Sequence, residues 1–231
     1  MIMRLGGLMK LTLLDFPGRV ACTVFTGGCN LCCPFCHNSG IVTGSDKDEI
    51  SEEEFLFFLT KRRGILDGVC VSGGEPLIQS DIIGFLQKIK ELGYAVKLDT
   101  NGTMPDMLRE AAEGGYCDSI AMDIKNSPQR YAETVGVSDF DMSAIYKSAE
   151  YIMNCGCDYE FRTTVVREFH TVADIIGAAE IIRGAKKYFL QPFRDSDGVM
   201  RQGLHTFDEN ELQILLKAAR TVVPRTKLRG V

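Results

Sequence analysis

Short apolar runs alternate with amphipathic stretches along most of this chain. Six runs have the length and composition of buried strands, at residues 20–25, 68–71, 95–99, 119–124, 159–166 and within 187–193. The segments that follow them repeat apolar residues every three or four positions, which is the spacing of a helix buried on one side. Six successive β-then-α units predict a parallel sheet covered by helices.

Capping residues mark the starts of several predicted helices. Ser51 with Glu54, and Thr206 with Glu209, have the spacing of a capping box, and Ser80 is expected to cap a third helix. The predicted helices cover about 52–63, 82–92, a stretch from 105, a stretch from 141, 171–183 and 207–221.

Two architectures fit six such units. A closed barrel needs eight, so the choice lies between an incomplete barrel and a doubly wound open sheet. Both place their chemistry at the carboxyl ends of the strands. Repeats, low-complexity tracts and inter-domain linkers do not stand out, so we expect one domain over 1–231. The least regular stretches, 37–48 and 194–205, are candidate functional loops.

Composition and charge narrow the class of protein. The chain has 231 residues, of which 45% are hydrophobic and 25% charged, as is usual for a water-soluble chain with one core. Its net charge is −5, whereas a nucleic-acid or membrane-surface partner favours a basic excess, so neither partner is expected. A signal peptide and a stretch of about 20 apolar residues are not apparent, so we expect a cytoplasmic protein.

Nine cysteines are the most informative residues of the sequence. Four of them fall within eight positions: Cys29, Cys32, Cys33 and Cys36. In a reducing compartment such a group indicates metal ligands or catalytic thiols before disulfides. The other five are expected to behave as small hydrophobic residues, namely Cys22, Cys70, Cys117, Cys155 and Cys157.

The spacing of the four clustered cysteines allows two ligand sets of three. One is Cys29, Cys33 and Cys36, and the other uses Cys32 in place of Cys33. Four ligands on one zinc ion would require two adjacent residues to bind the same ion, and structural zinc sites draw on separated pairs. Three thiolates on a four-iron cluster leave one iron open, which suits a catalytic metal. A small zinc or redox loop, as in a non-catalytic metal-binding adaptor, is the alternative.

The segment Thr-Gly-Gly-Cys-Asn-Leu-Cys-Cys-Pro-Phe-Cys-His-Asn, residues 26–38, resembles the signature of the radical S-adenosylmethionine (SAM) superfamily, which reads C-x3-C-x-aromatic-C. The resemblance implies a [4Fe–4S] cluster held by Cys29, Cys33 and Cys36, with SAM bound at the open iron. It places Phe35 and His37 beside the cofactor and leaves Cys32 without a ligand role.

Polar motifs at later strand ends extend the resemblance. Gly73-Gly74-Glu75 resembles the superfamily's Gly-Gly-Glu motif, in which the absence of Cβ atoms lets the backbone approach SAM. The other implied cofactor contacts are Asp99, Thr100, Asp123, Lys125, Arg162 and Gln191. Asp123 and Lys125 are two apart on a strand and so face the same side. A barrel brings all these strand ends to one mouth, so the resemblance favours a partial (β/α)6 TIM-type barrel with its core at about 11–193.

Residues 11–38 are most similar to glycyl-radical-enzyme activases, and among these to the activating proteins of anaerobic ribonucleotide reductase. Pyruvate formate-lyase activating enzymes are the near relatives. The resemblance implies reductive cleavage of SAM to a 5′-deoxyadenosyl radical, which removes hydrogen from a glycine of a partner enzyme. It also implies a flavodoxin- or ferredoxin-type electron donor, a partner contact at Asp15 and a monovalent cation near Asp99.

Two features depart from the formate-lyase type. Arg194 stands where those activases carry a His after the sixth strand, and a ferredoxin-like cysteine insert is absent, so a second cluster is not expected. His170 and His205 belong to no motif and are expected in core or surface positions. A radical enzyme acting on a small molecule, such as one of deazaguanine synthesis, is the alternative within the superfamily.

Overall fold

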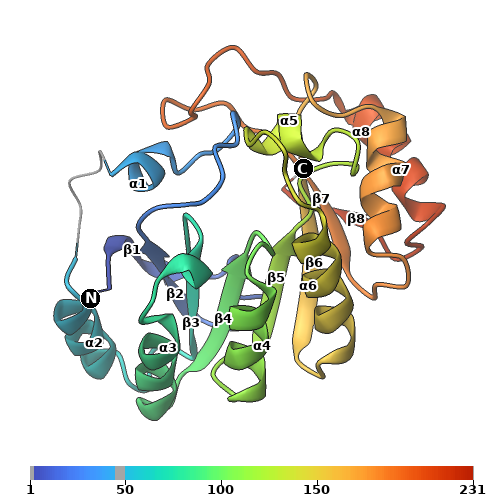
Figure 1. The fold of residues 1–231 in the computed structure, drawn as a ribbon. Coiled ribbons are helices and arrows are strands. Elements are labelled where there is room, and N and C mark those ends of the chain that lie inside the picture. Colours follow the sequence, from blue (N-terminus) through green and yellow to red (C-terminus); the bar gives the residue numbers. More distant parts are fainter. Residues whose placement is uncertain (1–2, 45–49, 231) are drawn as a thin grey trace. The chain divides into compact units, whose positions relative to one another are not determined.

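The computed structural model describes residues 3–44 and 50–230, and it confirms the six predicted strands. They are β2 (Ala21–Thr26), β3 (Gly68–Gly73), β4 (Ala95–Thr100), β5 (Ser119–Asp123), β6 (Asp158–Val165) and β7 (Tyr188–Pro192). The six predicted helices are also present, as α2 (Glu52–Lys61), α3 (Ile82–Glu91), α4 (Pro105–Glu113), α6 (Ser143–Asn154), α7 (Val172–Ile181) and α8 (Glu209–Arg220). The alternation of β and α units is therefore real (Figure 1).

Five short or irregular elements were not predicted. They are β1 (Leu5–Thr12), α1 (Ser39–Thr43), the 3-10 helix η1 (Pro76–Ile78), α5 (Tyr131–Val135) and β8 (Lys227–Leu228). Strand β1 runs antiparallel to β2, but its middle residues are half-buried or exposed in runs, so it lacks the alternation of a half-buried strand. The other four have five residues or fewer, too few to show a helical or strand period.

Two of the three predicted caps were wrong. The capping box of Ser51 and Glu54 is present at the start of α2. Helix α3 starts after Asp81 rather than Ser80, and its N-cap makes no side-chain hydrogen bond. Helix α8 is capped by Asp208 and Glu211, two positions after the predicted pair. The prediction was misplaced because both pairs have the spacing of a capping box.

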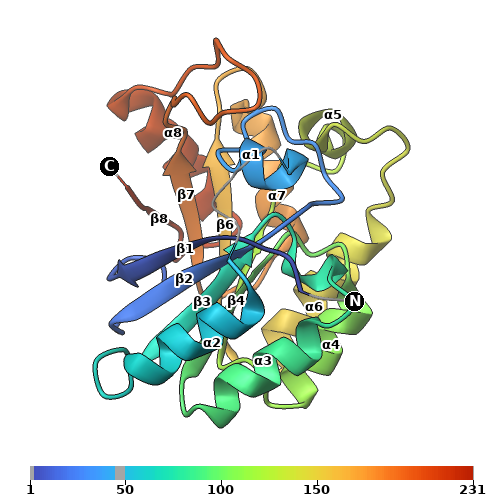
Figure 2. The same cartoon turned by 90° about the vertical axis from the view of Figure 1, so that its left-hand side faces the viewer.

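The chain divides into two compact units. The first comprises Met1–Asn30, Gly40–Ala121 and Cys155–Asp158, and the second Leu31–Ser39, Met122–Asn154 and Tyr159–Val231. In the first unit the sheet order is β1-β2-β3-β4, and β2, β3 and β4 are parallel. Helices α2, α3 and α4 lie on one side of these strands (Figures 1 and 2), and Phe55 of α2 packs on Phe85 of α3 with ring centroids 5.6 Å apart.

In the second unit β6, β7 and β8 are parallel and neighbouring strands follow chain order. Helices α7 and α8 lie beside these strands (Figures 1 and 2). Phe161 of β6 and Tyr188 of β7 are fully buried, and burial of such side chains contributes about 1.5–3 kcal/mol each. Across residues 3–44 and 50–230, no helix is long and apolar enough to cross a membrane.

Candidate functional site

In the first unit, the end of β3 is packed directly on the start of the cysteine loop. A Cβ on Gly74 would lie 1.8 Å from the Gly28 carbonyl oxygen, and one on Gly73 would lie 2.3 Å from the Thr26 nitrogen. The amides of Gly74 and Glu75 donate to the carbonyls of Thr26 and Gly28, both at 3.0 Å. The two glycines are therefore required by the chain's own backbone, which holds the cysteine loop against β3, and their contact with SAM stays a prediction.

Glu75 joins the loops that follow β3 and β4. Its carboxylate is fully buried and accepts hydrogen bonds from the Leu77 amide (3.1 Å), the Thr100 hydroxyl (2.9 Å) and the Asn101 amide (2.6 Å). Charged hydrogen bonds of this kind are the strong ones in proteins. The hydrogen bond between Thr100 and Glu75 therefore fixes the end of β4 against the loop that follows β3.

Asn101 is a site residue that the sequence analysis missed. Its side-chain amide donates to the side-chain oxygen Oδ1 of Asn30 at 2.9 Å and to the Cys29 sulfur at 3.8 Å. Hydrogen bonds to cysteine sulfur tune the properties of a thiolate ligand. The sequence did offer an indication, because Asn101 directly follows the predicted site residue Thr100 at the end of the same strand.

Lys97 is the second residue that was missed. It lies in the middle of β4, only 1% of its side chain is exposed, and its ammonium pairs with the Asp99 carboxylate. The Ser72 hydroxyl donates to the other oxygen of Asp99 at 3.2 Å. The sequence indicated this pair, because a lysine within an otherwise apolar strand is buried and a buried ammonium requires a partner. The monovalent cation near Asp99 stays a prediction, and the structure adds a lysine ammonium beside the same carboxylate.

We expect Lys97→Met to destabilise the protein by about 3–5 kcal/mol, because it leaves the largely buried Asp99 charge without this partner. The double variant Lys97→Met/Asp99→Asn removes both charges and should recover much of that loss. The measurement is the thermal unfolding midpoint of the two variants and of wild type. Equal midpoints for the single and double variants would contradict a stabilising pair.

Asp15 precedes β2 and is anchored to it. The Thr23 hydroxyl donates to the Asp15 carboxylate, and the Asp15 amide donates to the Thr12 hydroxyl oxygen at 3.2 Å. Beside it, Leu11, Leu13 and Leu14 are 59%, 66% and 82% exposed. Three exposed leucines in one short segment are unusual for a surface without a partner, but the partner contact itself stays a prediction.

In the second unit, the rest of the cysteine loop forms a tight turn. The Cys36 amide donates to the Cys33 carbonyl at 3.0 Å, and Cys33 is buried whereas Cys32 is exposed. The Cys32 amide donates to the Val135 carbonyl at 2.9 Å. The predicted loop 194–205 is hydrogen-bonded to this turn: the Met200 amide donates to the Cys36 carbonyl, and the Arg201 amide donates to the Pro34 carbonyl.

His37 and Gln191 occupy the region around the end of β7. The His37 ring nitrogen Nε2 contacts the Arg194 carbonyl oxygen, and its ring lies on Phe193 with centroids 5.5 Å apart. Gln191 is half-buried and stands opposite Thr164 of β6. Their contacts with a cofactor stay predictions.

Asp123, Lys125 and Arg162 form a charged triad in the second unit. Asp123 accepts from the Lys125 ammonium at 2.9 Å and from Arg162 Nε at 2.8 Å. Strand β5 ends at Asp123, so Lys125 lies beyond the strand and is brought to Asp123 by this ion pair. Burial acts to raise the pKa of Asp123, but the two cations hold it well below its usual range. Burial acts to lower the pKa of Lys125, but Asp123 and the nearby Cys33 raise it. The triad therefore carries a net positive charge at neutral pH.

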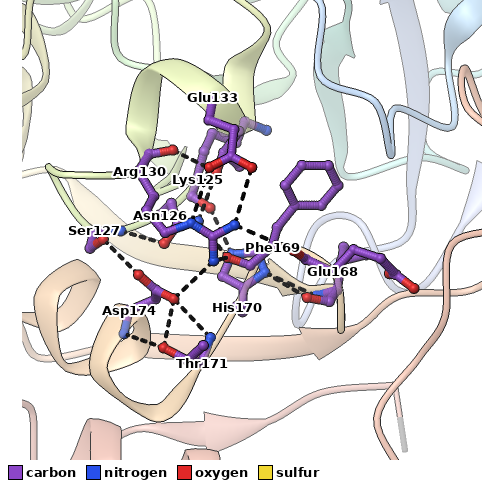
Figure 3. Close-up of polar contacts among 12 residues, drawn as sticks. Lys125, Asn126, Ser127, Arg130, Glu133, Glu168, Phe169, His170, Thr171 and Asp174 are labelled. Atoms are coloured by element: carbon purple, nitrogen blue, oxygen red, sulfur yellow. Dashed lines mark hydrogen bonds and ion pairs between the residues drawn. The ribbon is translucent and has the colours of Figure 1, made fainter.

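A hydrogen-bonded frame supports the loops that follow β5 and β6 (Figure 3). The Arg130 guanidinium donates to the Phe169 carbonyl at 2.8 Å and to Asp174 at 3.2 Å, and Asn126 donates to the Phe169 carbonyl at 2.9 Å. His170 is buried, as expected, and links Val166 to the Lys125 carbonyl at 2.9 Å.

The same frame presents two rings to the cysteine loop. Phe169 and His170 lie against Phe35, with ring centroids 5.7 and 6.4 Å away. Phe35 is 4% exposed. The aromatic residue of the cysteine motif is thus held in a buried aromatic group, which fixes the turn between Cys33 and Cys36.

The cysteines suit an iron–sulfur cluster by their chemistry. None of the nine forms a disulfide, and cysteine thiolates are the usual protein ligands of such a cluster. Cys29 belongs to the first unit, and Cys33 and Cys36 belong to the second. Within residues 3–44 and 50–230, no three His, Cys, Asp or Glu side chains are grouped as ligands of one metal ion. The ligand set therefore stays a prediction from the spacing.

Comparison with known proteins identifies the relatives of this chain. The sequence profile described as "Radical SAM superfamily" matches residues 23–182. The "Putative glycyl-radical enzyme activating enzyme MJ1227" of Methanocaldococcus jannaschii is 30% identical over 98% of this chain and 95% of its own length. The pyruvate formate-lyase-activating enzyme of Clostridium pasteurianum is 33% identical over 53% of this chain and 52% of its own length, so the match spans about half of that relative.

The fold is shared with solved structures. The crystal structure of QueE from Escherichia coli is similar with a TM-score of 0.59, at 15% sequence identity, over 99% of this chain and 94% of that one. With the profile match, this likeness confirms the α/β fold of the partial (β/α)6 barrel type.

Proposed function

This chain belongs to the radical SAM superfamily, and from that premise we propose that it is an activating enzyme that generates a glycyl radical on a partner enzyme. The observation that carries the proposal is the 30% identity to the putative glycyl-radical enzyme activating enzyme MJ1227. That similarity extends over 98% of this chain, so it includes the segments on both sides of the cysteine loop.

The family implies a [4Fe–4S] cluster and SAM as cofactors. We propose that Cys29, Cys33 and Cys36 hold the cluster and that SAM binds where one iron has no protein ligand. When bound, the two groups supply a one-electron reductive cleavage and a radical able to remove hydrogen from glycine. The protein residues bind, orient and shield these groups.

The charged triad is suited to the carboxylate of SAM. Lys125 and Arg162 both pair with the carboxylate of Asp123, so these three side chains together carry one net positive charge. A positive centre with paired, partly buried side chains is pre-organised for an anion and does not have to be ordered on binding. The frame around Arg130 and His170 holds the backbone that carries Lys125.

The partner is proposed to be anaerobic ribonucleotide reductase, with a reduced flavodoxin or ferredoxin as electron donor. Support comes from the sequence of residues 11–38. Asp15 and the three exposed leucines at 11, 13 and 14 offer an apolar surface with one anchored carboxylate, which is suited to contact with a protein. This contact would place the partner beside the strand that leads into the cysteine loop.

The test is electron paramagnetic resonance spectroscopy of the reduced, cluster-loaded protein incubated with SAM and anaerobic ribonucleotide reductase. We expect the doublet of a glycyl radical, and none when SAM is omitted. Pyruvate formate-lyase and a deazaguanine precursor are the parallel substrates. A doublet with pyruvate formate-lyase alone would show that formate-lyase, and not the reductase, is the partner. Turnover of the deazaguanine precursor without any doublet would contradict the activase proposal.

A further inference from the structure

Three cysteines outside the predicted cluster loop meet in the first unit, in the segments that lead into β5 and β6. Cys117 lies two residues before β5, and Cys155 and Cys157 flank Gly156 just before β6. The Asp158 amide donates to the Asp118 carbonyl at 3.3 Å, which holds the two segments side by side. The Cys157 thiol donates to the Cys117 carbonyl oxygen at 3.8 Å.

The three thiols lie within hydrogen-bonding range of one another, and the Cys157 sulfur accepts from the thiols of Cys117 and Cys155. The bond from Cys117 is the largest influence, and together they lower the pKa of Cys157 to about 6 against the opposing effects of burial and Asp118. The bond to Cys157 and burial raise the pKa of Cys117. Cys157 is therefore the thiol of the group that ionises most readily, and Cys117 is its protonated neighbour.

A reactant can reach this group. Cys117 is 4% exposed, but Cys155 and Cys157 are half-buried. Gly156, between them, has a φ of +86°, and a Cβ built on it meets no atom within 4 Å. Gly156 is exposed and the cysteines on either side of it are partly accessible, as a reactive cysteine requires.

We propose that Cys157 and Cys117 form a dithiol–disulfide site whose oxidant is a disulfide. The Cys157 thiolate attacks one sulfur of the oxidant, which forms a mixed disulfide and releases one thiolate of the oxidant. That thiolate takes the proton of Cys117, whose sulfur attacks the Cys157 sulfur and releases the second thiolate. Two electrons pass from the two cysteines to the oxidant, which is reduced to a thiol and a thiolate.

The site is separate from the proposed activase chemistry. Cys117 and Cys157 are at the amino ends of β5 and β6, whereas Asp123 ends β5 and Arg162 lies further along β6. The bond would link residues 40 positions apart and tie together the segments that enter these two strands. A result here neither supports nor weakens the glycyl-radical proposal.

The test treats the cluster-loaded protein anaerobically with oxidised glutathione, then quenches it in acid, blocks remaining thiols and maps the peptides. We expect a Cys117–Cys157 linked peptide in wild type and in Cys155→Ser, and its loss in Cys157→Ser. Cys22→Ser is the matched control, because that thiol is fully buried and burial raises its pKa to about 12. The linked peptide should be unchanged in this control.

A second measurement on wild type alone covers the case in which a variant fails to fold. Alkylation of Cys157 should rise through a midpoint near pH 6. At pH 6 it should be roughly 20-fold faster than alkylation of an unshifted cysteine, after allowance for the weaker nucleophilicity of a low-pKa thiolate. A Cys155–Cys157 peptide, no linked peptide, or a zinc ion bound by wild type and lost in Cys157→Ser would each overturn the proposal.

Discussion

Cys33→Ser is expected to give a protein that holds no complete iron–sulfur cluster and does not cleave SAM. A serine hydroxyl does not replace a thiolate, and a cluster that already has one open iron cannot spare a second ligand. Cys33 is buried and close enough to Lys125 to raise the pKa of that lysine, so a solvent ligand does not easily take its place. The measurement is the iron and sulfide content per chain after anaerobic reconstitution, together with SAM cleavage.

Cys32→Ser is the matched control for this prediction. The two cysteines are neighbours, but Cys32 is exposed and its structural contact, to the Val135 carbonyl, is made by the backbone amide. The variant should therefore keep the iron content and the cleavage activity of wild type. A protein that loses its cluster with Cys32→Ser and keeps it with Cys33→Ser would show that the other cysteine register is correct.

Glu75→Ala is expected to lower the thermal unfolding midpoint by roughly 10 °C, as a loss of about 4 kcal/mol does in a chain of this size. The substitution leaves the Leu77 amide, the Thr100 hydroxyl and the Asn101 amide without their shared acceptor. Each buried donor left unsatisfied costs about 1–3 kcal/mol, and neighbouring losses do not add fully. Glu75→Gln keeps one acceptor oxygen and should fall between wild type and Glu75→Ala.

The control for Glu75 is Glu53→Ala, since Glu53 is an exposed residue in the first turn of α2. It should change stability by no more than about 0.5 kcal/mol. If Glu75→Ala unfolds at the same temperature as Glu53→Ala, the buried carboxylate does not join the ends of β3 and β4 as described.

The strands and main helices could be predicted because each repeats its apolar residues within a short stretch of the sequence. Each is buried on one face or throughout, so the apolar spacing records it directly. Strand β1 could not be found this way, since its burial does not alternate, and α5 is too short to show a period. The start of α8 was misplaced because two overlapping pairs of residues fit the same capping pattern.

The contacts within the site depend on distance in space rather than in sequence. The residues at strand ends were identified from their motifs, but the partner of Glu75 lies 26 positions away at Asn101, and no spacing rule connects them. The glycines at 73 and 74 were identified from their motif, but the motif does not reveal that a Cβ at either position would meet the chain's own Thr26–Gly28 backbone. Cys117 and Cys157 likewise become neighbours only when β5 and β6 form.

The most direct test follows deuterium from the glycine of the partner enzyme into 5′-deoxyadenosine. Anaerobic ribonucleotide reductase prepared with deuterated glycine is incubated with the reduced protein and SAM, and the 5′-deoxyadenosine that forms is analysed by mass spectrometry. A glycyl-radical activating enzyme should transfer one deuterium into that product, and only when the partner is present. Production of 5′-deoxyadenosine without deuterium, in equal amount with and without the partner, would contradict the account.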